Sequence, residues 1–234
     1  CDIEATAKIC KNNDILLSLD NTFMSPYGQR PLEMGADITM QSSTKSLSGH
    51  SDILGGILAT NEKNLYEKLQ FMLKATGGVP SPFDNWLTLR STKTLALRYQ
   101  KATDNASGLA NFLSEHPSVI RTIYPGLDSH PQHEIAVKQQ LNPKGEVVFG
   151  SMLSIDVGDI GRRDEFLNKI EIFQLAESLG SVESLVCVPF FMTHAALPEK
   201  TKLEMGLTET LIRLSVGIED FDDLKIDLSN ALNN

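Results

Sequence analysis

The sequence has no long hydrophobic run and no cluster of basic residues. Its longest apolar segments, such as ILLSLD (15–20) and ESLVCVPFF (183–191), are far too short to span a membrane, and the first residues lack a signal-peptide pattern. Thirty acidic against 21 basic residues give a net charge of -9, and the basic residues are scattered. These features argue against nucleic-acid and membrane partners and favour a cytoplasmic location.

Cysteine is also scarce. Cys1, Cys10 and Cys187 are odd in number and have no metal-ligand spacing, which suits a reducing compartment. We expect neither a structural nor a metal-binding role for them.

The histidines do not form a metal site either. His50 lies near Asp52, and His130 near His133, but Pro131 interrupts any helix that could present the second pair. Neither pair has a third ligand at a familiar spacing, so we expect no bound metal and interpret these residues as structural or surface groups.

The 234 residues, of which 41% are hydrophobic, are enough for one large domain or two smaller ones. Up to about residue 100, apolar runs alternate with helical patterns, as in parallel α/β units. Beyond it, short alternating strands separated by helices indicate an α+β domain. We therefore expect an α/β region over residues 1–100 and a smaller α+β domain over 101–234.

The individual elements follow from their periodicity. A long helical region over 84–116 looks like a connector between the domains, with a break expected near Gly108. The other helices are expected at 1–14, 62–74, 162–170, 197–206 and 220–232, and the strands at 15–20, 36–41, 55–60, 150–158 and 210–217.

Asp20 closes the apolar run ILLSL. A carboxylate at the carboxyl end of a buried parallel strand lies where open α/β sheets bind their ligands. Alternatively, the sequence DNT simply starts a turn or caps a helix.

The segment SSTK (42–45) follows the next expected strand, so Ser42, Thr44 and Lys45 should lie beside Asp20. Alternating hydroxyls suit a phosphate, and a partly desolvated lysine can attack a carbonyl. Pyridoxal phosphate requires these groups together: a lysine, phosphate donors, and a carboxylate at the ring nitrogen. The alternative is a solvated loop whose lysine only faces water.

Arg213 lies within the expected strand TLIRLSVG (210–217). A guanidinium embedded in a strand with so little charge nearby should need an anion, and its planar fork fits a carboxylate. The alternative is a surface arginine on an edge strand.

Six segments together resemble the Cys/Met-metabolism enzymes that depend on pyridoxal phosphate. The resemblance covers essentially the whole chain, in order. It implies an α/β, PLP-dependent transferase-like fold (fold type I), represented by the carboxyl-terminal part of the large domain and a smaller α+β domain. The segments are LLSLDNTFMSPYGQRPLEMGADITMQSSTKSLSGHSDILGG, GGVPSPFDNWLTLRSTKTLALR, YPGLDSHPQHE, LAESLGSVESLV, MTHAALP and LIRLSVGIED.

The resemblance also implies roles for individual residues. Lys45 would form the Schiff base with the cofactor and then move protons on the substrate, while Asp20 would pair with the pyridinium nitrogen. Ser42 and Thr44 would contact the phosphate. Arg213 would bind the substrate's α-carboxylate, with Ser178 lining the same pocket.

Glu177 bears on substrate choice within the family. Its position is typically glutamate in cystathionine γ-lyases and γ-synthases, tyrosine in β-lyases and apolar in methionine γ-lyases. A carboxylate there can recognise the distal ammonium of cystathionine. The alternative is an exposed helix residue without such a role.

The segments are closest to the cystathionine γ-lyase branch. That branch implies γ-elimination of L-cystathionine to cysteine, 2-oxobutanoate and ammonia in trans-sulfuration, by a homotetramer built from tight dimers. A γ-synthase and an inactive fragment remain alternatives.

The sequence begins inside a helical pattern without methionine, so we expect a piece of a longer chain. In the family, the upstream part carries the rest of the phosphate cradle and a tyrosine that stacks on the cofactor. A sheet without its first strands should expose an edge and an apolar face.

Overall fold

The computed structural model describes residues 1–233 and divides into two compact units. The first comprises residues 1–97 and 134–148, and the second residues 98–133 and those from 149 onward. The segment 134–148 belongs with the first unit because Gln139 bonds to the backbone of Ile3 at 3.2 Å and Lys138 forms an ion pair with Glu4.

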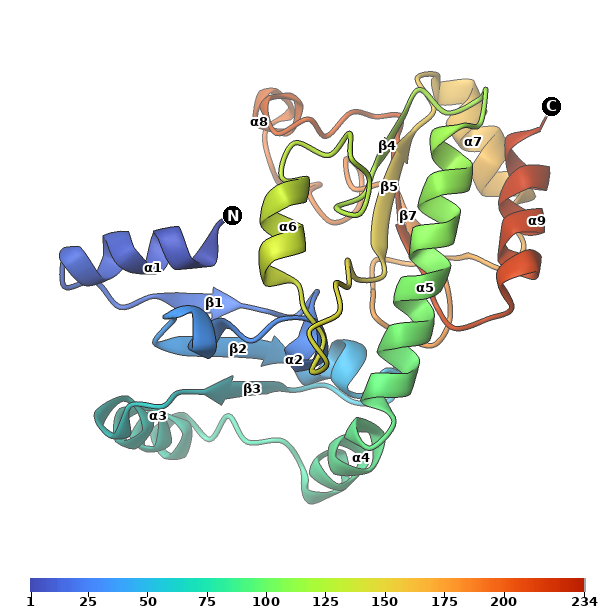
Figure 1. Cartoon of the computed structure of the whole chain (residues 1–234). Coiled ribbons are helices and arrows are strands. Elements are labelled where there is room, and N and C mark those ends of the chain that lie inside the picture. Colours follow the sequence, from blue (N-terminus) through green and yellow to red (C-terminus); the bar gives the residue numbers. More distant parts are fainter. Residues whose placement is uncertain (234) are drawn as a thin grey trace. The chain divides into compact units, whose positions relative to one another are not determined.

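The first unit contains a small sheet in the order β1-β2-β3. Strand β1 (Ser18–Asp20) runs parallel to β2 (Ile38–Ser42), with Asp20 opposite Met40, and both point in the same direction in Figure 1. Parallel α/β units were expected throughout, but β3 (Gly56–Ala59) runs antiparallel to β2. The reason is that the connection turns back at the same sheet edge, where Ser43 N donates to Gly55 O at 3.0 Å.

Helices α1 (Ile3–Asn12), α3 (Lys63–Thr76) and α4 (Pro82–Thr92) accompany this sheet, with the short elements α2 (Ser25–Gly28), η1 (Pro31–Met34) and η2 (Ser43–Leu47). The Asp2 side chain caps α1 by accepting a bond from Ala5 N, and α1 buries Ile3 and Ala7. Every residue of β3 is exposed, and α3 buries none of its side chains. The apolar side chains that remain exposed on these elements include Ile57, Leu58, Tyr66, Phe71 and Met72.

The expected helical region over 84–116 is interrupted at a different place than predicted. It breaks at residues 93–94, between α4 and α5 (Leu95–Ser114), and α5 continues through Gly108. A Cβ at Gly108 would lie 2.5 Å from Cε2 of Phe221 in α9 (Phe221–Leu232). The glycine therefore permits close helix packing and does not end the helix.

The second unit contains a sheet in the order β4-β5-β8-β7-β6. All neighbours pair antiparallel except β6 and β7, which are parallel. The strands are β4 (Arg121–Ile123), β5 (Met152–Asp156), β6 (Gln174–Leu175), β7 (Leu185–Cys187) and β8 (Leu211–Ser215). Because β8 lies in the middle of this sheet, Arg213 is not on an edge strand.

Helices α5, α7 (Ile160–Lys169) and α9 pack on one face of this sheet, as Figure 1 shows. Ile212 and Leu214 of β8 point into that core and are fully buried, whereas Arg213 between them lies on the other face. The unit also holds α8 (Glu199–Glu204), and α6 (His133–Gln139) begins at its boundary. Other fully buried core residues are Leu109, Leu113, Ile155, Phe166, Leu224 and Leu228.

Asp227 of α9 fixes the chain just before β6. Its buried carboxylate accepts bonds from the backbone N–H of Glu171 (2.8 Å), Ile172 (2.9 Å) and Phe173 (3.3 Å). A carboxylate with three N–H donors makes stronger bonds than neutral acceptors do.

Replacing Asp227 by asparagine is expected to lower the free energy of unfolding by about 2 kcal/mol, because one acceptor oxygen and the charge are lost in a buried place. Urea unfolding followed by circular dichroism measures the change. Asp223→Asn, at an exposed position of the same helix, is the control and should cost about 0.5 kcal/mol or less. Equal losses in the two variants would contradict the role of the buried carboxylate.

Candidate functional site

The ends of β1 and β2 are joined through the Thr22 side chain. Its hydroxyl donates to Asp20 Oδ1 at 2.6 Å and accepts a bond from Ser42 N at 2.9 Å. Thr22 N also donates to Asp20 Oδ1 at 2.9 Å. The structure thus brings Asp20 and Ser42 together, as the order of the strands predicted. Thr22, which the sequence reasoning did not single out, is the group that connects them.

The two oxygens of the Asp20 carboxylate have different surroundings. Oδ1 closes a turn by accepting the Thr22 N–H, which is the turn-forming role of aspartate. Among residues 1–233, Oδ2 has no hydrogen-bond partner, and the side chain is exposed. One oxygen is therefore held in place while the other remains available to a ligand.

The turn after Asp20 is itself fixed by buried amides. Asn21 Nδ2 donates to the carbonyl oxygens of Ser25 (3.0 Å) and Gln29 (2.8 Å), and Gln29 Nε2 donates back to Asn21 Oδ1 at 2.8 Å. Asn21 is 1% exposed. Moving the turn would break these bonds and leave buried amide groups unpaired, which costs stability. The network therefore fixes the turn that carries Asp20. In the sequence, only the tripeptide DNT indicated this turn.

Lys45 lies in η2, immediately after the end of β2. Its backbone leaves helical geometry (φ -89°, ψ -136°), and Gly49 N donates to its carbonyl oxygen at 2.8 Å. Ser42, Thr44 and Lys45 are half-buried, whereas Ser43, Ser46 and Ser48 are buried. The lysine is therefore partly buried and belongs to a structured turn.

The two predicted phosphate-binding hydroxyls differ in their surroundings. Thr44 Oγ1 accepts the Gly55 N–H at 3.0 Å and donates to Gly55 O at 3.4 Å, so it is already used to close the connection to β3. The Ser42 hydroxyl has no hydrogen-bond partner in the described part of the chain. To donate to an anion, the Thr44 hydroxyl would have to give up its long bond to Gly55 O, while it could keep the bond that it accepts from Gly55 N.

These groups fit pyridoxal phosphate. The carboxylate oxygen Asp20 Oδ2 is available for a protonated ring nitrogen, Ser42 offers an unused hydroxyl to a phosphate, and Lys45 provides an amine on a half-buried residue. The donor set at this end of the sheet therefore matches the functional groups of that cofactor.

In the second unit, Arg213 is held by the backbone of its neighbours. Nη2 donates to Glu177 O at 2.7 Å and to Ser178 O at 3.3 Å. Within residues 1–233, no carboxylate forms an ion pair with Arg213. Its charge is therefore open to an external anion.

Glu177 and Ser178 lie in the loop between β6 and β7, where the alternative interpretation of Glu177 expected a helix. Gly180 N in this loop donates to Ser215 Oγ of β8 at 2.9 Å. Ser184, near its end, accepts the Gly217 N–H at 2.9 Å. These two bonds attach the loop to β8 and to the residues that follow β8. The Glu177 side chain itself is exposed.

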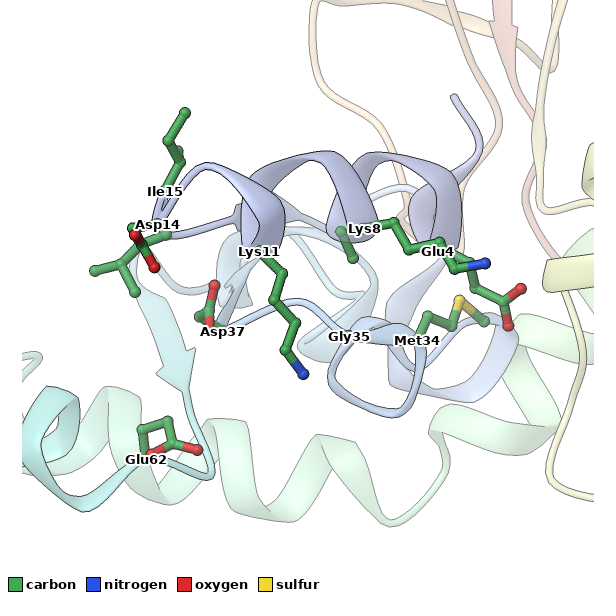
Figure 2. Close-up of a pocket in the computed structure, with 11 residues that line it drawn as sticks. Glu4, Lys8, Lys11, Asp14, Ile15, Met34, Gly35, Asp37 and Glu62 are labelled. Carbon is green, nitrogen blue, oxygen red and sulfur yellow. The ribbon is translucent and has the colours of Figure 1, made fainter.

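A cavity of about 710 Å³ lies at the other end of the first unit's sheet, next to the residues that precede β1 and β2 (Figure 2). Lys11 extends from α1 into it, and Asp37 and Glu62 contribute carboxylates. Asp37 Oδ2 accepts the Leu17 N–H at 2.7 Å. Open α/β sheets bind ligands at the carboxyl ends of their strands, so this cavity is not the candidate site.

The histidines have local partners. His133 Nδ1 contacts Pro125 O at 2.8 Å, and His50 Nδ1 contacts Ser48 O at 2.6 Å. In the described residues, no cluster of three or more His, Cys, Asp or Glu side chains could hold a metal ion. Over the same residues, none of the helices combines the length and the apolar character needed to cross a bilayer.

Comparison with known proteins adds independent information. The model of the family described as Cys/Met metabolism PLP-dependent enzyme matches residues 1–233. The cystathionine gamma-lyase of Dictyostelium discoideum is 52% identical over 231 residues, which are 99% of this chain and 58% of that protein. The cystathionine gamma-lyase of Bacillus subtilis is 48% identical over 100% of this chain and 60% of its own length. The chain thus spans about three fifths of these relatives.

Two solved structures have the same fold. The cystathionine gamma-lyase of Lactobacillus plantarum, complexed with L-serine, has a TM-score of 0.93 at 40% identity, over 98% of this chain and 59% of that one. A cystathionine gamma synthase of Xanthomonas oryzae pv. oryzae, in complex with aminoacrylate and cysteine, has a TM-score of 0.94 at 39% identity, over 99% and 58%. The expected PLP-dependent transferase-like α/β fold is confirmed.

Proposed function

Because the chain belongs to the Cys/Met metabolism PLP-dependent enzyme family, we propose that it carries the cofactor-binding lysine of an enzyme that cleaves L-cystathionine. The reaction is a γ-elimination, in which L-cystathionine and water give cysteine, 2-oxobutanoate and ammonia. The observation that supports it best is the junction of Asp20, Thr22 and Ser42 immediately before Lys45. It gathers at one sheet edge the groups that this chemistry needs.

The first unit would hold the cofactor. When bound, pyridoxal phosphate supplies a protonated ring that stores the electrons released when the α proton leaves. Asp20 Oδ2 keeps a proton on the ring nitrogen, Ser42 and Thr44 hold the phosphate, and Lys45 is the point of covalent attachment. The amine of Lys45 would also move protons at the α and neighbouring carbons of the substrate.

The second unit would recognise the substrate. Arg213 binds the α-carboxylate by charge-assisted hydrogen bonds, and Ser178 lines the carboxylate site. The exposed carboxylate of Glu177 is open to the distal ammonium of cystathionine, which carries the opposite charge. An apolar side chain at this position would not attract that ammonium, and an aromatic one would lack the opposite charge.

A γ-synthase is the second candidate, supported by the structural likeness to the Xanthomonas oryzae enzyme. The same residues would serve γ-replacement of an activated homoserine by cysteine. In either case we propose a cytoplasmic homotetramer, a dimer of dimers, with small amino acids as ligands. The free thiols of Cys1, Cys10 and Cys187 suit such a reducing compartment.

Product analysis of the complete protein, loaded with pyridoxal phosphate, separates the candidates. With L-cystathionine alone, we expect cysteine, 2-oxobutanoate and ammonia in equal amounts. A parallel assay supplies an activated homoserine together with cysteine. Turnover of the second pair only would replace the lyase by the synthase, and no turnover in either assay would support the third alternative of an inactive relative.

A further inference from the structure

Arg213 has two small uncharged neighbours in its sheet. In the antiparallel register, Arg213 of β8 lies opposite Ser154 of β5 on one side and Cys187 of β7 on the other. Directly opposed residues of antiparallel strands project from the same face and contact each other. The side chain of Arg213 therefore lies between the hydroxyl of Ser154 and the thiol of Cys187.

The thiol is buried beside the guanidinium. Cys187 is 1% exposed and lies directly opposite Arg213 in the register of β7 and β8. The carbonyl oxygens of Glu177 and Ser178 hold Nη2 of the same group. Arg213 is thus held by two carbonyl oxygens beside a buried thiol, and none of these groups carries a full negative charge.

Asp156, the carboxylate nearest to Arg213 along β5 and β8, already has other hydrogen-bond partners. Asp156 of β5 lies opposite Leu211, one step along the same face. It accepts bonds from Thr210 (2.6 Å) and Thr208 (3.2 Å) and lies 3.9 Å from Arg121. It therefore does not neutralise Arg213.

The protonation state of the thiol agrees with this arrangement. Burial raises the pKa of the Cys187 thiol, the nearby guanidinium of Arg213 lowers it, and the carboxylate of Glu177 raises it, so that the net direction is upward. The thiol is consequently protonated and neutral at neutral pH, and it does not compete for the charge of Arg213.

We propose that Cys187 is a positioning residue, which holds the Arg213 guanidinium by a neutral contact and so leaves its charge to the substrate's α-carboxylate. This inference rests on the proposed function of Arg213 as the carboxylate-binding group. It predicts that a carboxylate at position 187 would act as an internal competitor of the substrate.

The first test compares Cys187→Asp with Cys187→Asn, which have nearly the same shape and differ in charge. In the complete protein loaded with pyridoxal phosphate, we expect KM for L-cystathionine to be at least tenfold higher in the aspartate variant, with a smaller change in kcat. Gln174→Glu, which adds a carboxylate at an exposed position of the same sheet, should leave KM unchanged. Equal KM values in C187D and C187N would overturn the proposal.

Binding without turnover gives a second readout. Glycine and glycinamide are titrated against each variant and followed by the absorbance of the cofactor. The glycine dissociation constant should be at least tenfold higher for C187D than for C187N, whereas glycinamide, which has no carboxylate, should bind both alike. An equal loss for both ligands would show a general defect of the site and contradict the proposal.

A further pair of variants decides the matter if the aspartate variant does not fold. Cys187→Ala removes the contact and should raise KM about fivefold, while Cys187→Ser, whose hydroxyl can accept from the guanidinium, should recover most of that loss. Equal KM values for the alanine and serine variants would overturn the positioning role.

Arg213→Leu separates this inference from the proposed function. An unchanged KM in that variant would overturn the carboxylate-binding role of Arg213, and the proposal for Cys187 with it. If KM rises at least about 100-fold in Arg213→Leu and the paired Cys187 variants do not differ, only the proposal for Cys187 is overturned.

Discussion

Replacing Lys45 by alanine is expected to lower kcat for L-cystathionine in the complete protein by at least about 10⁴-fold, because the variant loses both the covalent attachment point and the proton-transfer amine. The visible absorbance of the bound cofactor should change or vanish. Lys45 is suited to both tasks because it is half-buried and follows β2 directly, in a turn closed by Gly49 N.

Lys63→Ala, at an exposed position of α3, is the matched control and should keep full activity. Borohydride treatment followed by peptide mass analysis should place the reduced cofactor on Lys45. Attachment to a different lysine, or normal turnover by the Lys45 variant, would refute the assignment.

Replacing Asp20 by asparagine is expected to lower kcat by about 10²–10³-fold with little change in structure. Asparagine retains an oxygen that can accept the bonds from Thr22, so the junction between β1 and β2 is preserved. What it loses is the negative charge of the available oxygen, which would stabilise a protonated ring nitrogen. The loss should therefore appear in kcat more than in KM.

Asp37→Asn provides the comparison for this prediction. Asp37 lies at the opposite end of the same sheet, where its Oδ2 accepts the Leu17 N–H. That variant should retain kcat within about twofold, whatever it costs in stability. If Asp20→Asn kept more than about a tenth of the original kcat, the carboxylate would not have the role proposed for it.

The sequence predicted the meeting of Asp20 with the SSTK segment because both follow apolar strands, and parallel strands end at the same sheet edge. It did not predict Thr22, whose hydroxyl accepts a bond from Ser42, 20 positions further along the chain. No local pattern marks such a bond. The residues alone indicated only part of the chemistry of the site. The resemblance to a family was needed to name the cofactor and the substrate.

The direction of strands and the packing of helices were harder to predict from the sequence than the presence of these strands and helices. The antiparallel course of β3 depends on bonds between Gly55 and the residues around Thr44, which apolar periodicity does not record. Gly108 was interpreted as a helix breaker because glycine has low helix propensity, but the Phe221 ring requires a residue without a side chain there. In both places a contact distant in sequence decided the local structure.

The way in which the loop before β7 holds Arg213 has a consequence for how members of this family diverge. Arg213 donates to the backbone oxygen of Glu177, and the Glu177 side chain takes no part in this bond. On the roles proposed for Arg213 and Glu177, exchanging this side chain for an aromatic or apolar one would change the preferred substrate, while the backbone bond that holds the carboxylate-binding arginine would stay the same.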